Sequence, residues 1–145
     1  MARVLVVDDE PRYRELIQSA LTQDNHEVQT AADGQEAMES AFGFQPEVLI
    51  TDWMLKAPMN GLDVVTVLRS VFPELRAILI TGFATEDLIL EANQMEVCEF
   101  LPKPFSADPL RDVVRKSIGM TGKFAVHLPI GILEISNSVS ISRSA

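Results

Sequence analysis

The chain has little cysteine, histidine or positive charge, and each shortage excludes a class of protein. Its single cysteine, Cys98, cannot form an internal disulfide, and with only His26 and His127 beside it a thiolate–imidazole metal cluster is excluded. The 12 Lys and Arg residues face 21 Asp and Glu, a formal net charge of -9 that repels phosphate backbones and anionic lipid. A basic, DNA-coating protein is therefore excluded, and we expect no binding to membrane surfaces.

Long apolar runs are missing too. The longest nearly uncharged stretch, Phe124 to Leu133, is far shorter than the roughly 20 residues that a spanning helix needs, and Val4 to Val7 is too short for a signal-peptide core. We therefore expect a cytoplasmic protein. The 145 residues, 47% of them hydrophobic and 23% charged, suit one folded domain, which typically has roughly 150 residues.

What the chain does have is a regular alternation of two patterns. Short apolar runs rich in β-branched residues predict five strands, and three of them are continuous, as in parallel strands covered on both faces. These runs are Val4 to Val7, Val28 to Ala31, Val48 to Thr51, Ala77 to Ile80 and Val97 to Leu101. Stretches with apolar residues at helical spacing lie between and after them. The alternation predicts an α/β domain of (βα)5 type, a three-layer parallel sheet with helices on both faces.

Helix start and stop signals agree with this count. Pro11 suits a first helical turn, Asp33, Thr85 and Ser106 suit helix N-caps, and Pro73 stops a helix. The apolar stripes of these helices predict which side chains are buried. The stripes include Phe42, Val71 and Ile89.

Polar residues follow four of the predicted strands at the point where each strand ends. Asp8 and Asp9 follow the first strand, Asp52 the third, Thr81 the fourth and Lys103 the fifth. An acidic pair considered alone is as readily a solvated loop or a helix cap. Because ligands of such sheets sit beyond the carboxyl ends of the strands, the joint pattern favours a single site.

The chemistry of this set suggests a missing component. Three carboxylates packed together repel one another and stay ionised only with a cation between them, and oxygen ligands without imidazole or thiolate select Mg²⁺. Three carboxylates, one divalent ion and Lys103 sum to a neutral site, which can accept an anion. A phosphoryl group would find there the charge neutralisation that its transfer requires.

Four segments carry a resemblance to a known family. They are VLVVDDE at Val4 to Glu10, LITDWM at Leu49 to Met54, ILITG at Ile78 to Gly82 and FLPKPF at Phe100 to Phe105. Together they make residues 1–118 similar to the receiver domain of two-component response regulators, of the single-domain type. The resemblance implies a flavodoxin-like sheet with strand order 2-1-3-4-5.

The resemblance also implies a role for each motif residue. Asp52 resembles the phosphoacceptor, and Asp9, Asp52 and the backbone carbonyl of Met54 resemble direct Mg²⁺ ligands. Asp8 resembles a ligand that acts through water. Mg²⁺ is accordingly the cofactor that we expect.

Three further positions complete the implied mechanism. Thr81 resembles the switch hydroxyl, Phe100 the switch aromatic, and Lys103 the ammonium that contacts the phosphoryl group. The family's Lys–Pro bond at Lys103 to Pro104 is cis. The donor implied is a phosphohistidine in a histidine kinase or a phosphotransfer protein. The change implied is on the surface of the fourth helix, fifth strand and fifth helix, where a downstream protein or a second copy, forming a homodimer, would bind.

Some positions depart from the family pattern. Pro58 and Gly61 lie six and nine residues after Asp52 rather than four and eight, so the loop is expected to be one residue longer. Met54 and Phe83, both apolar, stand two residues after Asp52 and Thr81, where neither can orient a water by hydrogen bonding. We therefore expect slow autodephosphorylation.

Residues 119–145 form a C-terminal extension. Gly119 to Lys123 is expected to be a linker, and the period-two pattern from Leu133 to Ile141 predicts a strand that pairs with its own sheet or a neighbouring chain. A disordered tail is the alternative. Nothing in the extension resembles a helix-turn-helix, so no direct DNA binding is expected.

Two other functional classes are weighed beside the phosphorylated signalling module. One is a phosphorylation-independent protein-binding adaptor with the same fold, against which the complete set of Asp8, Asp9, Thr81 and Lys103 argues. The other is a phosphatase, which would need a second carboxylate where Met54 stands. We therefore expect a phosphoacceptor and not an enzyme with turnover.

Overall fold

The computed structural model describes residues 1–56, 58–97, 99–119, 123–128 and 131–136, the last two ranges as backbone. Five strands alternate with five helices and form one parallel sheet in the order β2-β1-β3-β4-β5. The elements are β1 (Arg3–Val7), α1 (Pro11–Gln23), β2 (Glu27–Ala31), α2 (Gly34–Phe44), β3 (Val48–Asp52), α3 (Gly61–Val71), β4 (Arg76–Thr81), α4 (Glu86–Gln94), β5 (Glu99–Pro102) and α5 (Ala107–Gly119). The predicted fold class and strand order are confirmed.

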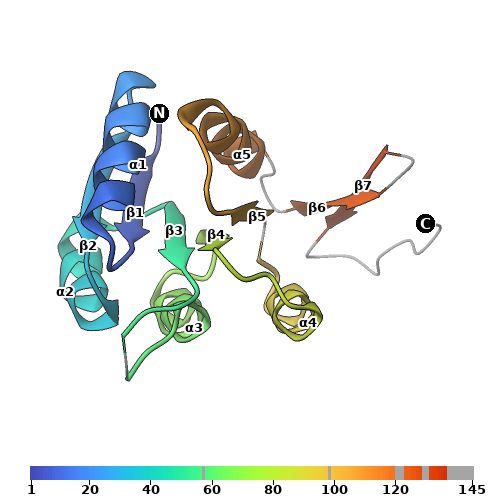
Figure 1. Ribbon diagram of the computed structural model, residues 1–145, viewed down its shortest axis with the longest axis horizontal. Coiled ribbons are helices and arrows are strands. Elements are labelled where there is room, and N and C mark those ends of the chain that lie inside the picture. Colours follow the sequence, from blue (N-terminus) through green and yellow to red (C-terminus); the bar gives the residue numbers. More distant parts are fainter. Residues whose placement is uncertain (57, 98, 120–122, 129–130, 137–145) are drawn as a thin grey trace.

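The helices cover both faces of the sheet (Figure 1). Helices α1 and α5 lie on one face, and α2, α3 and α4 lie on the other. Val4 and Val6 of β1 belong to the core under α1 and α5, whereas Leu5 and Val7 belong to the core under α2 and α3. All four side chains are fully buried, and each contributes about 1.5–3 kcal/mol of hydrophobic stabilisation. This two-sided burial explains why β1 is continuously apolar.

Two predicted helix caps are present. Oδ1 of Asp33 accepts a hydrogen bond from the Glu36 N–H at 2.8 Å, and Oγ1 of Thr85 accepts one from the Leu88 N–H at 3.2 Å. Helix α3 begins with a cap that the sequence reasoning missed. Asn60 and Asp63 form a reciprocal capping box there, with both hydrogen bonds at 2.9 Å.

Three side chains predicted to lie on buried stripes are instead exposed. Phe42 of α2 is 64% exposed, Val71 of α3 is 46% exposed and Ile89 of α4 is 38% exposed. Each lies at the margin of its apolar stripe, where the curvature of the helix surface carries it past the edge of the layer below. Helical spacing identified the buried side of each helix but overestimated the width of the stripe.

Strand β5 begins later than predicted. Glu96 adopts a left-handed φ of 55°, and the Val97 N–H donates to the Ala92 carbonyl at 3.2 Å, so both residues close α4. The strand therefore starts at Glu99 and not at Val97.

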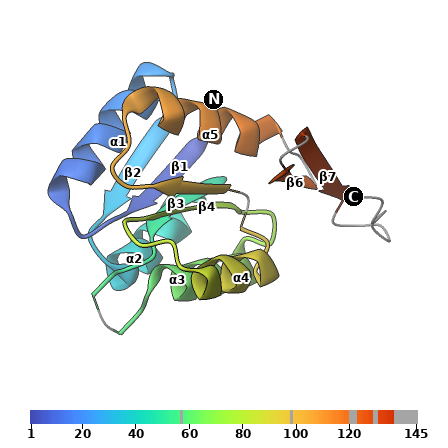
Figure 2. The same ribbon diagram turned by 45° about the vertical axis from the view of Figure 1, so that its right-hand side comes forward.

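The C-terminal extension contains a hairpin of β6 (Lys123–Leu128) and β7 (Gly131–Ser136), paired antiparallel with Phe124 opposite Ile135. In Figures 1 and 2 the hairpin lies outside the three layers. Strand β7 covers the first part of the strand predicted from Leu133 to Ile141, and it pairs with β6 rather than with the main sheet. Residues 137–141, and residues 120–122 of the predicted linker, lie outside the described residues. Among the described helices, none is long and apolar enough to cross a membrane.

Candidate functional site

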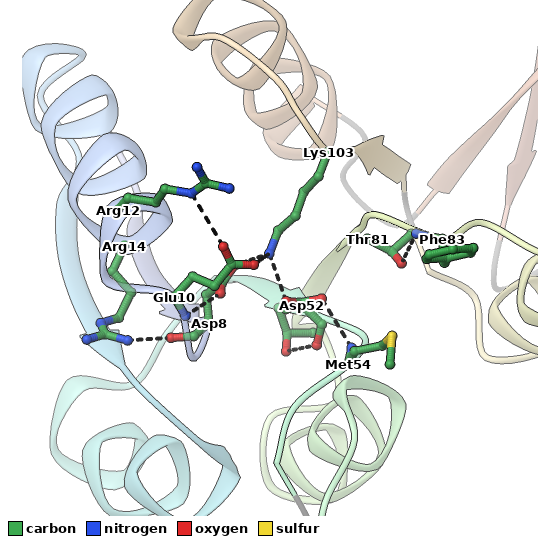
Figure 3. A network of polar contacts seen from close by, with 10 residues as sticks. Asp8, Glu10, Arg12, Arg14, Asp52, Met54, Thr81, Phe83 and Lys103 are labelled. Atoms are coloured by element: carbon green, nitrogen blue, oxygen red, sulfur yellow. Dashed lines mark hydrogen bonds and ion pairs between the residues drawn. The ribbon is translucent and has the colours of Figure 1, made fainter.

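The carboxyl edge of the sheet brings one ammonium group against three carboxylates (Figure 3). Nζ of Lys103 lies 2.8 Å from Oδ2 of Asp52, 3.0 Å from Oδ2 of Asp8 and 3.1 Å from Oε1 of Glu10. These residues follow or end β5, β3 and β1. The parallel sheet therefore gathers groups that are up to 95 positions apart in the sequence.

The two aspartates of this cluster are deeply buried. Asp8 is fully buried and Asp52 is 5% exposed. Desolvation by burial raises the pKa of both carboxyl groups above the ordinary value, and hydrogen bonds to Lys103 oppose that rise without cancelling it. The two groups also repel each other, which adds to the raised pKa of Asp8. The site thus holds negative charge that Lys103 alone does not fully compensate.

Lys103 stays charged in this setting. Burial lowers the pKa of its ammonium group, but hydrogen bonds to Asp52 and Asp8 outweigh burial and raise that pKa above the ordinary value. Its side chain is only 8% exposed. Lys103 is therefore a permanent, desolvated positive charge beside the Asp52 carboxylate.

Backbone contacts fix the orientation of Asp52. Its Oδ1 accepts a hydrogen bond from the Met54 N–H at 3.1 Å. The next residue, Trp53, donates its N–H to the Ile80 carbonyl at 2.9 Å and accepts one from the Gly61 N–H at 2.8 Å. The backbone next to the Asp52 carboxylate is thus fixed by hydrogen bonds to β4 and to the start of α3.

Asp8 is held just as firmly. Its Oδ1 accepts the Glu10 N–H at 2.8 Å, and its backbone carbonyl accepts a hydrogen bond from Nη1 of Arg14 at 2.7 Å. Its Oδ2 is buried, and among the described residues its one polar contact is the Lys103 ammonium at 3.0 Å. A buried carboxylate oxygen in this position has capacity for a further cationic partner.

The donor set fits a magnesium ion. Asp8, Asp9, Glu10 and Asp52 each offer a carboxylate oxygen, and these oxygens lie within 4.8 Å of one another. Hard oxygen donors are the ligands that Mg²⁺ prefers. A divalent ion would stabilise the ionised forms of Asp8 and Asp52, whose pKa values are raised, and would give the buried Oδ2 of Asp8 a second cationic partner beside Lys103.

A pocket of about 280 Å³ opens over this cluster. Its lining combines charged groups with apolar ones, namely Asp9, Glu10, Asp52, Met54, Gly82, Phe83 and Lys103. Met54 is 58% exposed and Phe83 is 73% exposed, so both apolar side chains stand at the mouth. The charged groups of the cluster are therefore reached past an apolar rim.

The remaining predicted residues lie at the same edge with different contacts. Thr81 is buried at the end of β4, and its Oγ1 accepts the Phe83 N–H at 3.0 Å rather than contacting Asp52 (Figure 3). The Thr81 carbonyl accepts the Lys103 N–H at 2.8 Å. Phe100 is partly buried on β5 and, like Trp53, packs against the core cluster that contains Leu79 and Leu88. The Lys103–Pro104 peptide bond is cis, as the resemblance implied.

With this geometry established, comparison with known proteins identifies the family. A model of the response regulator receiver domain matches residues 4–115. The chain belongs to this family. The chemotaxis protein CheY4 of Vibrio cholerae superposes with a TM-score of 0.76 at 28% identity, covering 81% of this chain and 98% of that one.

Two curated relatives differ in length. Sporulation initiation phosphotransferase F of Bacillus subtilis is 26% identical over 115 residues, 79% of this chain and 91% of that protein. The probable transcriptional regulatory protein TcrX of Mycobacterium tuberculosis is 37% identical over 137 residues, 90% of this chain. A match of that length extends beyond the receiver domain into the C-terminal extension. The chain spans only 57% of the length of TcrX.

Sequence reasoning about this receiver domain missed some contributors to the site. Glu10 ends the first motif, but its contact with Lys103 at 3.1 Å does not follow from the motif. The Arg14 guanidinium donates to the Asp8 carbonyl and Gly61 packs against the Asp52 carbonyl, and such contacts depend on local geometry that residue spacing does not specify. The position of the Lys103 ammonium over the Tyr13 ring is likewise not visible in residue spacing.

Proposed function

We propose that this receiver domain accepts a phosphoryl group on Asp52 from a phosphohistidine in a histidine kinase or phosphotransfer protein. The observation that carries the proposal is the Asp52 carboxylate itself. It is nearly buried at the end of β3, with Oδ2 2.8 Å from Lys103 Nζ and Oδ1 on the Met54 N–H. A carboxylate fixed beside a desolvated ammonium in a small anion-sized pocket is suited to nucleophilic phosphoryl transfer.

In the proposed step an Asp52 oxygen attacks the phosphorus atom. A phosphorus–oxygen bond forms and the phosphorus–nitrogen bond of the donor breaks, with its electron pair returning to the imidazole. The product is an aspartyl phosphate. Mg²⁺, held by Asp8, Asp9, Asp52 and the Met54 carbonyl, would supply neutralisation of the charge on the phosphoryl oxygens.

The chain's own groups have distinct tasks in this step. Lys103 binds an oxygen of the transferring group, because its ammonium already lies at the Asp52 oxygen. The Met54 N–H orients the nucleophile through Oδ1. Arg14 and the Glu10 N–H hold Asp8 in place from the opposite side. Positioning and charge neutralisation are the main sources of rate in phosphoryl transfer.

The signal is proposed to leave the site through Thr81 and Phe100. A phosphoryl group adds up to about -2 of charge, and its oxygens can accept a hydrogen bond from the Thr81 hydroxyl, whose oxygen accepts the Phe83 N–H. Movement of Thr81 toward the new oxygens would free space for Phe100 to rotate inward, which changes the surface of α4, β5 and α5. Leu90 of α4 is already 61% exposed on the outside of that helix. A downstream protein or a second copy would bind there.

The competing proposal is an adaptor that works without phosphate. Such an adaptor does not require Lys103 to be buried among carboxylates. Burying these charges costs desolvation free energy, and charge clusters of this kind are typical of reactive sites. Absence of direct DNA binding and a cytoplasmic location stay predictions. One relative is named a probable transcriptional regulatory protein, and it is longer than this chain.

Phosphorylation is tested by incubating the protein with Mg²⁺ and a small acyl phosphate and measuring intact mass. The natural chain and Asp112→Asn, a control at an exposed acid of α5, should each gain one phosphoryl group, and Asp52→Asn should gain none. Slow loss of that group, without turnover, is expected of a phosphoacceptor. An unmodified natural chain, or a phosphorylated Asp52→Asn variant, would contradict the proposal.

A further inference from the structure

An aromatic ring lies directly against the Lys103 ammonium group. Nζ of Lys103 is 4.2 Å from the centroid of the Tyr13 ring, well within the range of a cation–π interaction. Tyr13 stands in the first turn of α1 and its side chain is almost completely buried. Its ring packs in turn on Phe105, with centroids 5.3 Å apart and the planes tilted by 40°. Burial and the contact with Phe105 therefore fix the position of the ring.

The ring differs from the other partners of Lys103 in one respect. The three carboxylates that contact Nζ are themselves charged groups whose environment changes when an anion enters the pocket. Glu10 is 43% exposed, so its ion pair is weakened by solvent. The negative face of the Tyr13 ring is neutral overall and does not compete with phosphoryl oxygens for the proton donors of Lys103.

Arg12 approaches the same ring from the surface. Its guanidinium carbon is 5.1 Å from the Tyr13 centroid, and its Nε is 3.4 Å from Oε2 of Glu10. Arg12 is 78% exposed and therefore well hydrated, whereas the Lys103 side chain is 8% exposed. Because cation–π attraction is strongest for a desolvated cation, the ring acts chiefly on Lys103.

We propose that Tyr13 is a positioning residue for phosphoryl transfer, holding the Lys103 ammonium between its aromatic face and the Asp52 carboxylate. This inference rests on the proposed function of Asp52. The ring would keep Nζ in line with the incoming phosphoryl oxygens while the carboxylate contacts rearrange. Tyr13 itself touches neither the donor nor the acceptor oxygen.

The rate of phosphorylation by a small acyl phosphate with saturating Mg²⁺ provides the first test. Tyr13→Leu removes the aromatic face and should lower the maximal rate about 3- to 30-fold, the range expected for one cation–π contact. Tyr13→Phe keeps the ring and should retain most of the rate. Phe72→Leu removes a partly buried ring from the opposite face of the sheet and should not lower it.

A spectroscopic test needs neither donor nor metal. The ring current of Tyr13 should shift the NMR signals of the Lys103 ε-methylene and ammonium groups upfield, since the ammonium lies over the ring. Tyr13→Phe should keep that shift, whereas Tyr13→Leu and Tyr13→Met, which lack a ring, should abolish it. Lys103 signals that stay at the natural positions in both variants without a ring would overturn the inference.

The outcomes separate this inference from the proposed function. A natural protein that takes up phosphate, beside a Tyr13→Leu variant that does so equally fast, would overturn the role of Tyr13 alone. A natural protein that takes up none would overturn the proposed function and this role with it. If Tyr13→Leu fails to fold, phenylalanines of increasing fluorine content at position 13 weaken the aromatic face at nearly constant shape. The rate should then fall with each fluorine, and a flat series would overturn the inference.

Discussion

The backbone of Gly61 lies against the carbonyl group of Asp52 so closely that a β-carbon at position 61 would overlap it. The Gly61 N–H also donates to the Trp53 carbonyl at 2.8 Å. The first residue of α3 thus packs on the peptide that carries the proposed phosphoacceptor. The loop that starts after Asp52 returns to the same peptide, and a glycine is required at its end.

Substitution of Gly61 should therefore damage both stability and the site. Gly61→Ala should lower the free energy of unfolding by about 1–3 kcal/mol, the usual cost of forcing atoms into a packed region. It should also slow phosphorylation of Asp52. Gly43→Ala is the matched control, because a β-carbon there meets no atom within 4 Å, and it should raise stability by about 0.5–1 kcal/mol. Equal effects of the two substitutions in denaturant unfolding would contradict this account.

The left-handed residue before β5 offers a stabilising change. Glu96 has a φ of 55°, a region that costs a non-glycine residue about 1–2 kcal/mol. Glycine avoids this cost, but its greater freedom in the unfolded chain offsets part of the stabilisation. Glu96→Gly should therefore raise the free energy of unfolding by about 0.5–1 kcal/mol. Glu91→Gly, the same replacement inside α4, should lower it by about 1 kcal/mol. Thermal unfolding of the pair measures both, and a loss of stability in Glu96→Gly would refute the assignment.

The raised carboxyl pKa values predict how stability depends on pH without divalent ions. Asp8 and Asp52 bind protons more tightly in the folded than in the unfolded state, so stability should fall as pH rises from about 4 through the raised values. Asp8→Asn removes one of these groups and should flatten that fall, leaving the variant more stable than the natural protein at neutral pH. Denaturant unfolding at several pH values measures it.

With Mg²⁺ present, the natural protein should instead be more stable than Asp8→Asn. Binding to the folded state alone stabilises the natural protein by mass action, and Asp8→Asn should gain less because the negative charge of one carboxylate beside the ion is lost. The fluorescence of Trp53, the only tryptophan and the neighbour of Asp52, should change with Mg²⁺ in the natural protein at lower concentration than in the variant. A variant that matches the natural Mg²⁺ titration would show that Asp8 does not help to hold the ion.

The apolar rim of the pocket predicts a long-lived aspartyl phosphate. Met54 stands at the mouth with an exposed thioether side chain that cannot orient an attacking water. Met54→Asn should speed loss of the phosphoryl group about 2- to 10-fold, the effect of one net hydrogen bond. Val67→Asn, at an exposed apolar residue of α3, should leave the decay unchanged. Decay followed by intact mass that is unchanged or slower in Met54→Asn would count against the idea.

The fold followed from the sequence because its signals are strong and redundant. Continuous apolar strands, caps such as Asp33 and Thr85, and strict alternation all point to the same three-layer architecture. The juxtaposition of Asp8, Asp52 and Lys103 followed from the same topology, since parallel strands end at one edge. Their family roles came from the motifs that surround them.

What escaped prediction depends on local geometry rather than on pattern. A polar residue at a left-handed position, as at Glu96, is not visible in apolar periodicity, and it moved the start of β5. The contact of Tyr13 with Lys103 joins residues 90 positions apart and depends on rotamers that spacing does not specify. The Thr81 hydroxyl likewise faces a neighbouring N–H that only the loop conformation reveals.

Chemical trapping of the phosphorylated residue tests the central claim most directly. After reaction with Mg²⁺ and an acyl phosphate, borohydride reduces an acyl phosphate side chain to an alcohol, and peptide mass mapping locates it. Reduction of Asp52 to homoserine, and of no other acidic residue, is the predicted result. Homoserine at Asp8 or Asp9, or 5-hydroxynorvaline at Glu10, in place of reduction at Asp52, or no reduced residue at all, would contradict it.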